Sequence, residues 1–222
     1  MATESAEFHC WYSADRGEAR KKGQYILDKF GKYLKGPVVD LGCGEGALLL
    51  VLRERGKTDL LGVESNKELA DLAASWGVPI VRKDLLSYLR EEKLASGTYI
   101  YLDVIEHVPF EDNLEVLSHI PEGSRVIIQT PNTESLLGHQ FYFNVPSHLA
   151  PYSPVVVRQM LTRGGYEIVK EGSVDGRHPD SWKRRLRRLI VKKVLGLPED
   201  MVLGGGNYFV VADRKRRARD DG

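Results

Sequence analysis

The sequence predicts an α/β fold in which a doubly wound, mostly parallel sheet carries helices on both faces. Two observations support this prediction. Residues 38–46 (VVDLGCGEG) place two β-branched residues before a glycine cluster, and the apolar run 47–52 follows, which is the pattern of a strand, a tight turn and a helix. After this unit, strand-like and helix-like segments go on alternating up to residue 130, and strands separated by helices pair in parallel sheets.

Length and composition fit one globular domain over residues 1–222. The hydrophobic content of 42% and the charged content of 28% are ordinary for such a protein, so disorder is not indicated. A net charge of +1 gives no general attraction to nucleic acids or membranes. The longest apolar run, 47–52, is far shorter than the roughly 20 residues of a membrane span, so no transmembrane segment is expected.

The N-terminal sequence and the cysteine content indicate the cellular compartment in which we expect the protein. The first residues contain no basic stretch followed by an apolar one, so a secretory signal is not expected. Cys10 and Cys43 are the only cysteines, which argues against a disulfide framework. We therefore expect a cytoplasmic protein.

Before the glycine cluster, the sequence predicts an arm and a helix. Residues 1–17 are polar but contain an aromatic cluster, which either closes over a site as a lid or packs on the domain. Residues 18–34 place apolar side chains at three- and four-residue steps, which is typical of an amphipathic helix. Gly36 and Pro37 end this helix and lead into the first strand.

Further strands and helices are expected after the glycine cluster. The strands cover residues 59–64, 78–82, 98–104, 125–130, 166–170 and 207–212. The helices cover residues 66–76, 84–92, 109–120 and 153–163. The last helix begins with Ser153 and Pro154, a favourable helix start, and ends before Gly164.

Two insertions interrupt this alternation. Residues 133–152 mix prolines and glycines with aromatic residues, so a loop or a short helix is expected, and long insertions of this kind are often functional. Residues 172–206 contain a basic amphipathic stretch, 180–195, with apolar residues on one face. This stretch either packs with a solvated basic face, binds phosphate or acidic groups of a substrate, or contacts a membrane surface. The charged tail 214–222 is expected to fray.

The glycine cluster predicts a ligand of the nucleotide kind. Gly42 and Gly44, followed by Ala47, match a dinucleotide fingerprint, and Glu64, roughly 20 residues further on, is placed to bind ribose hydroxyls. Glycines permit positive φ and a close approach of the ligand to the backbone, and the N–H groups of the following helix face the cleft. Taken alone, this pattern fits a nicotinamide cofactor as well as S-adenosylmethionine.

Acidic residues at the strand ends favour S-adenosylmethionine. Asp40 precedes the first glycine by two positions, where its carboxylate can organise the loop and receive an ammonium group, whereas a pyrophosphate gains nothing from that charge. Asp84 follows the third strand and Asp103 lies at the end of the fourth. Because ligands of parallel sheets bind outside the carboxyl ends of the strands, these acids and Glu64 point towards one crevice, which suits a cationic, hydroxyl-rich ligand.

Four motifs follow one another at these strand ends. They are VVDLGCGEG, GVES at the end of the second strand, KDL after the third and YLDVIEHVP after the fourth. Through them residues 18–170 and the last strand resemble the class I S-adenosylmethionine-dependent methyltransferases, close to the ubiquinone-biosynthesis-type branch. The resemblance implies a Rossmann-like seven-stranded sheet whose last strand is antiparallel.

The resemblance also implies roles for individual residues. The loop glycines would lie against the cofactor, and three acids would bind its ribose, its adenine amine and its methionine end. The glycines are Gly42, Gly44 and Gly46. The acids are Glu64 for the ribose, Asp84 for the adenine amine and Asp103 for the methionine end.

The N-terminal stretch FHCWYSADR is similar to the aromatic-plus-arginine arm of a methyltransferase subgroup associated with glycan and natural-product biosynthesis. In that subgroup Trp11, Tyr12 and Arg16 would cap the cofactor. A departure from related patterns is equally informative. The Asp/Asn-Pro-Pro-aromatic motif of methyltransferases that act on the amino groups of nucleic-acid bases is absent after the fourth strand, so methylation of DNA is not expected.

Two histidines are candidates for a general base, which the reaction needs only if the acceptor must lose a proton. His107 follows the fourth strand, and His148 lies in the insertion that should roof the acceptor pocket. The alternative interpretation of His107 is purely structural: its side chain supports the loop or the cofactor by contact. Glu106 with His107 could help ligate a divalent metal, as the resemblance to quinone-type O-methyltransferases permits. Two adjacent ligand-capable residues are weak evidence, however, and no metal is predicted.

The leading hypothesis is an S-adenosylmethionine-dependent methyltransferase that acts on an oxygen atom, with nitrogen as the alternative, of a small molecule or a glycan. Two other classes stay open at this point. One is a nicotinamide-dependent oxidoreductase. The other is a binding module that keeps this fold without catalysis and uses the basic helix 180–195 to hold RNA or an acidic partner. The two insertions should determine the acceptor, and neither contains a motif that identifies it.

Overall fold

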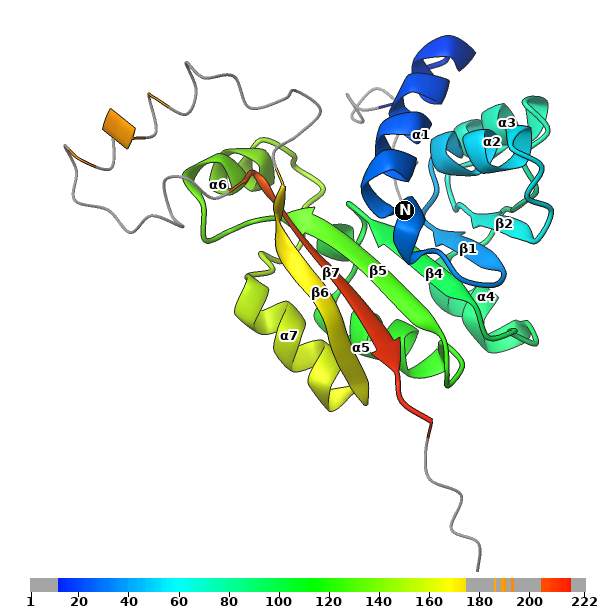
Figure 1. Ribbon diagram of the computed structural model, residues 1–222. Coiled ribbons are helices and arrows are strands. Elements are labelled where there is room, and N and C mark those ends of the chain that lie inside the picture. The colour runs from blue at the N-terminus through cyan, green and yellow to red at the C-terminus, as the bar shows by residue number, and fades with distance from the viewer. Residues whose placement is uncertain (1–11, 175–185, 187–188, 191–192, 194–204, 217–222) are drawn as a thin grey trace, which may run out of the picture.

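A seven-stranded sheet with the strand order β3-β2-β1-β4-β5-β7-β6 forms the framework of the protein (Figure 1). The computed structural model describes residues 12–174, 186, 189, 190, 193 and 205–216. Strands β1 to β5 pair in parallel, and β7 runs antiparallel between β5 and β6. The predicted mostly parallel sheet with an antiparallel last strand is therefore confirmed. The strands are β1 (Val38–Leu41), β2 (Leu60–Val63), β3 (Ile80–Val81), β4 (Thr98–Leu102), β5 (Arg125–Pro131), β6 (Tyr166–Val174) and β7 (Asn207–Arg214).

Each helix predicted within residues 12–174 is present, and the insertion 133–152 contains a short helix, α6. Two short 3-10 turns, η2 (Gly31–Tyr33) and η3 (Ile105–His107), follow α1 and β4. The α-helices are α1 (Arg16–Phe30), α2 (Ala47–Glu54), α3 (Lys67–Ser75), α4 (Leu85–Glu91), α5 (Phe110–His119), α6 (Leu136–Phe143) and α7 (Pro154–Arg163).

Different helices cover the two faces of the sheet, as Figure 1 shows. Helices α1, α2 and α3 pack on one face, and α4, α5 and α7 pack on the other. Strand β4 illustrates why: Tyr99 and Tyr101 pack with the second group of helices, whereas Ile100 between them packs with the first. Successive side chains of a strand point to opposite faces, so an apolar strand needs cover on both sides. The predicted doubly wound architecture is confirmed.

The parallel strands all end at one edge of the sheet, and the segments that follow them carry the predicted site residues. The glycine loop follows β1, and Glu64 follows β2. Asp103 and η3 follow β4, and α6 comes after β5. A ligand of an open α/β sheet binds at this edge.

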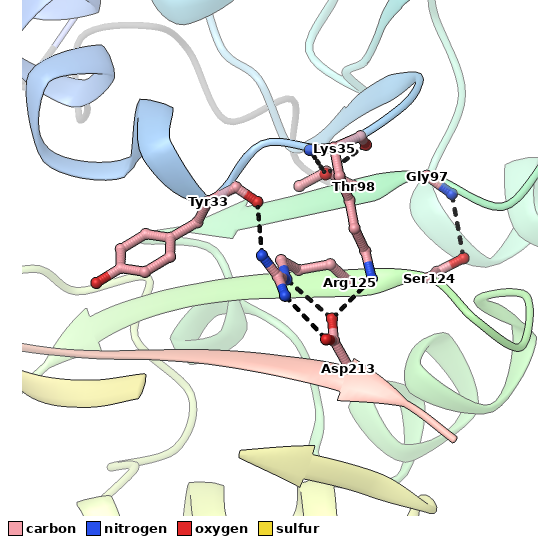
Figure 2. Close-up of polar contacts among 7 residues, drawn as sticks. All are labelled: Tyr33, Lys35, Gly97, Thr98, Ser124, Arg125 and Asp213. Carbon is pink, nitrogen blue, oxygen red and sulfur yellow. Dashed lines mark hydrogen bonds and ion pairs between the residues drawn. The ribbon is translucent and has the colours of Figure 1, made fainter. Parts of the chain in front are cut away.

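At the opposite edge, polar contacts tie four parts of the chain together (Figure 2). Arg125 at the start of β5 donates two hydrogen bonds of 2.8 Å to the two carboxylate oxygens of Asp213 on β7. Asp213 also accepts a hydrogen bond from Lys35 Nζ at 2.9 Å, and Arg125 donates to the carbonyl oxygen of Tyr33 at 3.2 Å. The hydroxyl of Thr98 bonds to both backbone groups of Lys35 at 2.8 Å. These contacts fix the chain after α1 to the sheet, away from the ligand edge.

Strand β6 is longer than predicted. It reaches Val174 rather than ending at Lys170, because it stays paired with β7 through Gly172 opposite Phe209 and Val174 opposite Asn207. The basic stretch 180–195 lies largely outside the described residues. Of it the structure describes residues 186, 189, 190 and 193, which are helical and exposed. Residues 1–11 of the predicted arm and 217–222 of the tail also lie outside. Among the described helices, none has the length and apolar character of a membrane span.

Candidate active site

The loop between β1 and α2 has backbone conformations that glycine adopts at little cost. Gly42, Gly44 and Gly46 have φ angles of 72°, 57° and 71°. A Cβ atom on Gly44 would come within 2.2 Å of a ring carbon of Tyr12, far closer than nonbonded atoms approach. Tyr12, from the predicted arm, therefore lies directly on bare backbone.

Glu64 fixes the shape of this loop from the end of β2. Its Oε2 accepts a hydrogen bond from the backbone N–H of Gly44 at 2.9 Å, and its Oε1 accepts one from the N–H of Asn66 at 2.8 Å. The side chain is buried. A buried carboxylate that accepts backbone hydrogen bonds is strongly held in place. Glu64 thus joins the β1 loop to the start of α3.

The glycine loop lies in a negatively charged environment. Burial raises the pKa of Asp40, which is 7% exposed, to about 7, while Lys22 opposes this rise and the carboxylates of Glu45 and Glu64 add to it. Lys22 Nζ donates to Glu45 Oε1 at 2.8 Å. Glu45 Oε2 is buried and has no hydrogen-bond partner in the part of the chain that the structure describes. This arrangement attracts a cation more readily than an anion.

A cavity of about 180 Å³ connects this loop with the segments that follow β4 and α6. Six residues predicted from the sequence to act in the site line its wall. They are Tyr12, Asp40, Gly42, Asp103, His107 and His148. The structure thus brings together residues that lie far apart in the chain.

Other predicted cofactor-binding residues do not line this cavity. Asp84 is exposed and caps α4 by accepting a hydrogen bond from the N–H of Ser87 at 2.9 Å, and hydrogen bonding by Ser87 holds the pKa of Asp84 below its ordinary value. Arg16 pairs with Glu54 at 3.2 Å on the surface. The adenine-binding and capping roles of these two residues stay predictions. The cavity lining also does not include Gly44, Gly46 and Glu64, which instead determine the shape of the loop.

Helix α1 supplies a row of lining residues that no sequence motif marks. Positions three, four and seven residues apart lie on one face of a helix. The spacing of seven between Lys22 and Lys29 is therefore the pattern in the sequence that could have indicated this row. Burial lowers the pKa of Lys29 to about 8, although the nearby carboxylate of Asp103 acts in the other direction. Its Nζ lies 4.3 Å from the centre of the Tyr25 ring. The row consists of Lys22, Tyr25, Ile26 and Lys29.

Asp103 has an unusual backbone conformation at the cavity wall. Its φ angle of 55° is uncommon for a residue with a Cβ atom, and such conformations persist where surrounding contacts hold them. The side-chain amide of Gln129 donates to both carboxylate oxygens of Asp103, at 2.9 and 3.1 Å. Gln129 Oε1 in turn lies 3.5 Å from Lys29 Nζ. Strands β4 and β5 and helix α1 therefore meet at this carboxylate.

His107 and His148 lie against each other although they come from different segments. Their ring centres are 4.6 Å apart, and the ring planes make an angle of 62°. The N–H of Leu149 donates to the backbone carbonyl of Glu106 at 2.8 Å, and His107 Nδ1 lies 3.2 Å from the carbonyl oxygen of Ser147. Contacts with backbone groups therefore hold the segment after α6, residues 144–153, against η3. The two histidines predicted as catalytic candidates form one cluster.

His148 presents a neutral imidazole. Its Nδ1 lies 2.6 Å from the carbonyl oxygen of Tyr142, and because a carbonyl oxygen only accepts, Nδ1 carries the proton and Nε2 the lone pair. Burial lowers the pKa of His148 below its ordinary value, against the effect of the bond to Tyr142. The Nε2 atom lies 4.0 Å from Glu106 Oε1.

Glu106 is a buried carboxyl group, 1% exposed. Its Oε2 accepts a hydrogen bond from the hydroxyl of Thr130 at 3.0 Å. Burial raises the pKa of Glu106 well above its ordinary value, and the charge of Asp103 adds to the shift. This group and the two histidines form a compact polar cluster at the wall of the cavity.

Residues 13–171 match the family model described as a methyltransferase domain. The chain belongs to this family. The predicted class I methyltransferase with S-adenosylmethionine as its cofactor is confirmed. A comparison with curated proteins gave no match. Membership of an enzyme family leaves the nicotinamide oxidoreductase and the non-catalytic binding module without support.

Solved structures share the fold of this methyltransferase. An S-adenosylmethionine-dependent methyltransferase from Archaeoglobus fulgidus is 23% identical, with a TM-score of 0.69, over 87% of this chain and 93% of the other. A possible histamine N-methyltransferase from Thermotoga maritima is 18% identical, with a TM-score of 0.67, over 96% of each chain. Magnesium protoporphyrin IX methyltransferase from Synechocystis, solved with bound S-adenosylmethionine, is 16% identical, with a TM-score of 0.54, over 91% of this chain and 80% of the other. These likenesses concern the fold.

Proposed function

We propose that this methyltransferase transfers the methyl group of S-adenosylmethionine to an oxygen atom of a small molecule or a glycan, with a nitrogen atom as the alternative acceptor. One observation carries the proposal: a single cavity is lined by Asp40 and Gly42 on the loop side and by His107 and His148 from the other segments. A donor against the loop and an acceptor at the histidines would share this space. Such sharing is required because the reacting atoms must meet at about 3–3.5 Å.

The residues on the loop side fit a cationic donor. Asp40 and Asp103 line the cavity, and Glu45 has a buried carboxylate oxygen without a partner among the described residues. Carboxylates attract sulfonium and ammonium groups and repel a pyrophosphate. When bound, the cofactor supplies a methyl group that is already activated, so the contribution of the protein is alignment of the reactants and exclusion of water.

Tyr12 is suited to cover the donor. Its ring lines the cavity and lies on Gly44, and Lys22 Nζ is 5.0 Å from the ring centre. Burial raises the pKa of Tyr12, with the charges of Glu64 and Glu45 adding to the shift, so the hydroxyl stays protonated at neutral pH. We infer that this aromatic ring excludes water from the donor, as the capping role expected for the arm requires.

The histidine cluster is suited to the acceptor. A hydroxyl must lose its proton as its oxygen attacks the methyl group, and a neutral imidazole can help in two ways. It can take the proton itself, or it can bind a cation that makes the hydroxyl more acidic. Nucleic-acid bases are not favoured as acceptors, because Asp103 to Glu106 read DVIE where base methyltransferases carry a Pro-Pro motif.

Titration with S-adenosylhomocysteine tests the donor side. We expect saturable binding of one molecule per chain in isothermal titration calorimetry. A chain that is folded by circular dichroism but does not bind would contradict the proposal. For the acceptor side, incorporation of tritiated methyl groups should be measured with phenols, hydroxy acids, glycans and amines. Labelling of amines without labelling of any hydroxyl compound would move the acceptor from oxygen to nitrogen.

A further inference from the structure

Glu106, His107 and His148 each offer one metal-binding atom, and these atoms all lie within 4.8 Å of one another. The first two residues belong to η3 after β4, and the third lies in the segment after α6. Only the fold brings the three together. Their cluster also lines the cavity that contains the glycine loop.

Both imidazoles are oriented by backbone carbonyl groups. The Nδ1 atom of His107 lies 3.2 Å from the carbonyl oxygen of Ser147, and that of His148 lies 2.6 Å from the carbonyl oxygen of Tyr142. In each neutral ring the proton therefore sits on Nδ1 and the lone pair on Nε2, the atom that can bind a cation. Metal-binding histidines are fixed in the same way in known sites.

The carboxylate completes the set of donors. The hydroxyl of Thr130 donates a hydrogen bond of 3.0 Å to Glu106 Oε2. In known metal sites, hydrogen bonds from residues that do not bind the metal orient the ligating carboxylates in the same way. Within the described part of the chain, the only ion-pairing partner of Glu106 is the imidazole of His148, whose Nε2 lies 4.0 Å from Glu106 Oε1. A carboxylate buried without lysine or arginine is costly unless it meets a cation or takes up a proton.

We propose that Glu106, His107 and His148 bind a divalent cation that holds the oxygen of the methyl acceptor. This inference rests on the proposed methyl transfer and chooses between the two roles open to the histidines. Two imidazole nitrogens and one carboxylate oxygen favour zinc, manganese, iron(II) or cobalt(II) over magnesium and calcium, which prefer oxygen ligands.

The geometry requires only a small adjustment. Bonds of about 2.0–2.2 Å put neighbouring ligand atoms about 3–3.5 Å apart. The three ligand atoms, which now lie within 4.8 Å of one another, therefore need to approach by up to roughly 1.3–1.8 Å. The backbone hydrogen bond from the N–H of Leu149 to the carbonyl of Glu106 already holds the segment after α6 against η3, so we expect side-chain rotations to provide this movement. Three protein ligands leave coordination positions for water or for the acceptor.

The cation changes how the acceptor loses its proton. A hydroxyl bound to a cation is more acidic, so its O–H bond breaks and the proton goes to solvent. The oxygen lone pair forms the new bond to the methyl carbon. The carbon–sulfur bond breaks at the same time, and its electron pair stays on sulfur, which yields S-adenosylhomocysteine. His107 and His148 then serve as ligands, and neither takes up the proton.

Titration of the full chain with cobalt(II) chloride tests the site. After dialysis against EDTA and then buffer, we expect one Co²⁺ per chain, seen as visible absorption bands and in calorimetry. Glu106→Gln, His107→Ala and His148→Ala should each weaken Co²⁺ binding at least about tenfold. His139→Ala is the matched control, because it removes an exposed histidine of α6 outside the cluster and should leave Co²⁺ binding unchanged. Circular dichroism and titration with S-adenosylhomocysteine show whether each variant is folded.

The outcomes separate this inference from the proposed function. A folded chain that binds S-adenosylhomocysteine but shows no saturable Co²⁺ binding would overturn the cation site and leave methyl transfer standing. The same holds if Co²⁺ binding survives His148→Ala, or if methyl transfer continues at full rate in EDTA, which would make the histidines bases. A chain that binds Co²⁺ but not S-adenosylhomocysteine would instead contradict the proposed function.

Discussion

The backbone N–H of Gly44 donates a hydrogen bond of 2.9 Å to Oε2 of Glu64, so the segments that follow the neighbouring parallel strands β1 and β2 are joined directly. The second oxygen of the same carboxylate accepts from the N–H of Asn66 at 2.8 Å. Both partners are backbone groups, so the conformation of the glycine loop depends on this one buried side chain. A residue predicted to bind the ribose thus organises the loop that we expect to face the cofactor.

Replacing Glu64 should weaken cofactor binding. In Glu64→Ala the N–H of Gly44 loses a charged acceptor, a contact of about 1.5–3 kcal/mol, and the loop is free to rearrange. We expect the affinity for S-adenosylhomocysteine to fall at least about tenfold in calorimetry, with a smaller loss in Glu64→Gln. Glu68→Ala, at an exposed acid in the first turn of α3, is the control. Unchanged affinity in Glu64→Ala would argue against both roles of this residue.

Gly44→Ala should damage the loop more than an alanine at a comparable glycine. Gly44 and Gly56 both have positive φ, 57° and 84°, so alanine at either position brings backbone strain of about 1–2 kcal/mol. Only at Gly44 would the Cβ atom also meet the ring of Tyr12, whereas nothing lies within 4 Å at Gly56. Urea unfolding should therefore show a larger loss of stability for Gly44→Ala, and only this variant should lose affinity for S-adenosylhomocysteine. Equal effects of the two variants would contradict the observed packing of Tyr12.

Local sequence patterns predicted the sheet well because they record burial directly. In β4, Tyr99, Ile100 and Tyr101 are apolar in succession, which indicates a strand buried on both faces, and the two cores confirm it. The glycine loop carries a similarly local signal. The strands, most of the helices and the position of the glycine loop after the first strand could therefore be predicted from the residues alone.

On the acceptor side, His107 and His148 could be named as candidates, but their pairing with each other and with Glu106 could not be predicted, because it depends on contacts between distant segments. His148 reaches Glu106 through the hydrogen bond from the N–H of Leu149 to the carbonyl of Glu106, and no local pattern marks that pairing. Asp84 shows a second limit. An aspartate between a strand and a helix suits both a ligand site and a helix N-cap, and in the structure its carboxylate caps α4 through Ser87.

Asp213→Asn should destabilise the protein without affecting the cofactor. The variant loses the two-point contact with Arg125, whose side chain is mostly buried, and we expect about 1–2 kcal/mol less unfolding free energy at pH 7. Its site lies at the edge of the sheet opposite the cavity, so the affinity for S-adenosylhomocysteine should not change. Lys83→Ala, which removes exposed ion pairs with Glu91 and Glu92, should cost less than about 1 kcal/mol.

The same pair predicts a pH dependence. Hydrogen bonding from Arg125 holds the pKa of Asp213 below its ordinary value. The stability that this contact contributes is therefore present above the ordinary pKa and is lost as the pH falls through the pKa of the folded state. Urea unfolding of the parent protein and of Asp213→Asn should converge at acidic pH. A difference that stays constant down to that range would show that the ion pair contributes nothing.

Asp40 should give the opposite pH dependence. Burial raises its pKa in the folded protein to about 7, while Lys22 limits the rise. Between the ordinary pKa of aspartate and pH 7 the folded protein then binds a proton that the unfolded chain has released, so the unfolding free energy falls as the pH rises through this window. The isosteric variant Asp40→Asn lacks this ionisation. The unfolding free energy of Asp40→Asn minus that of the parent should therefore rise by on the order of 2–3 kcal/mol as the pH goes from 5 to 8.

Comparison of two ligands connects this ionisation to function. S-adenosylmethionine carries a sulfonium charge that S-adenosylhomocysteine lacks, and an ionised Asp40 on the cavity wall attracts it. The affinity for S-adenosylmethionine should therefore rise more steeply between pH 6 and pH 8 than that for S-adenosylhomocysteine, and Asp40→Asn should remove the difference between the slopes. Calorimetry at three pH values in this range measures both. Parallel slopes in the parent protein would mean that Asp40 shapes the loop without contacting the charge of the donor.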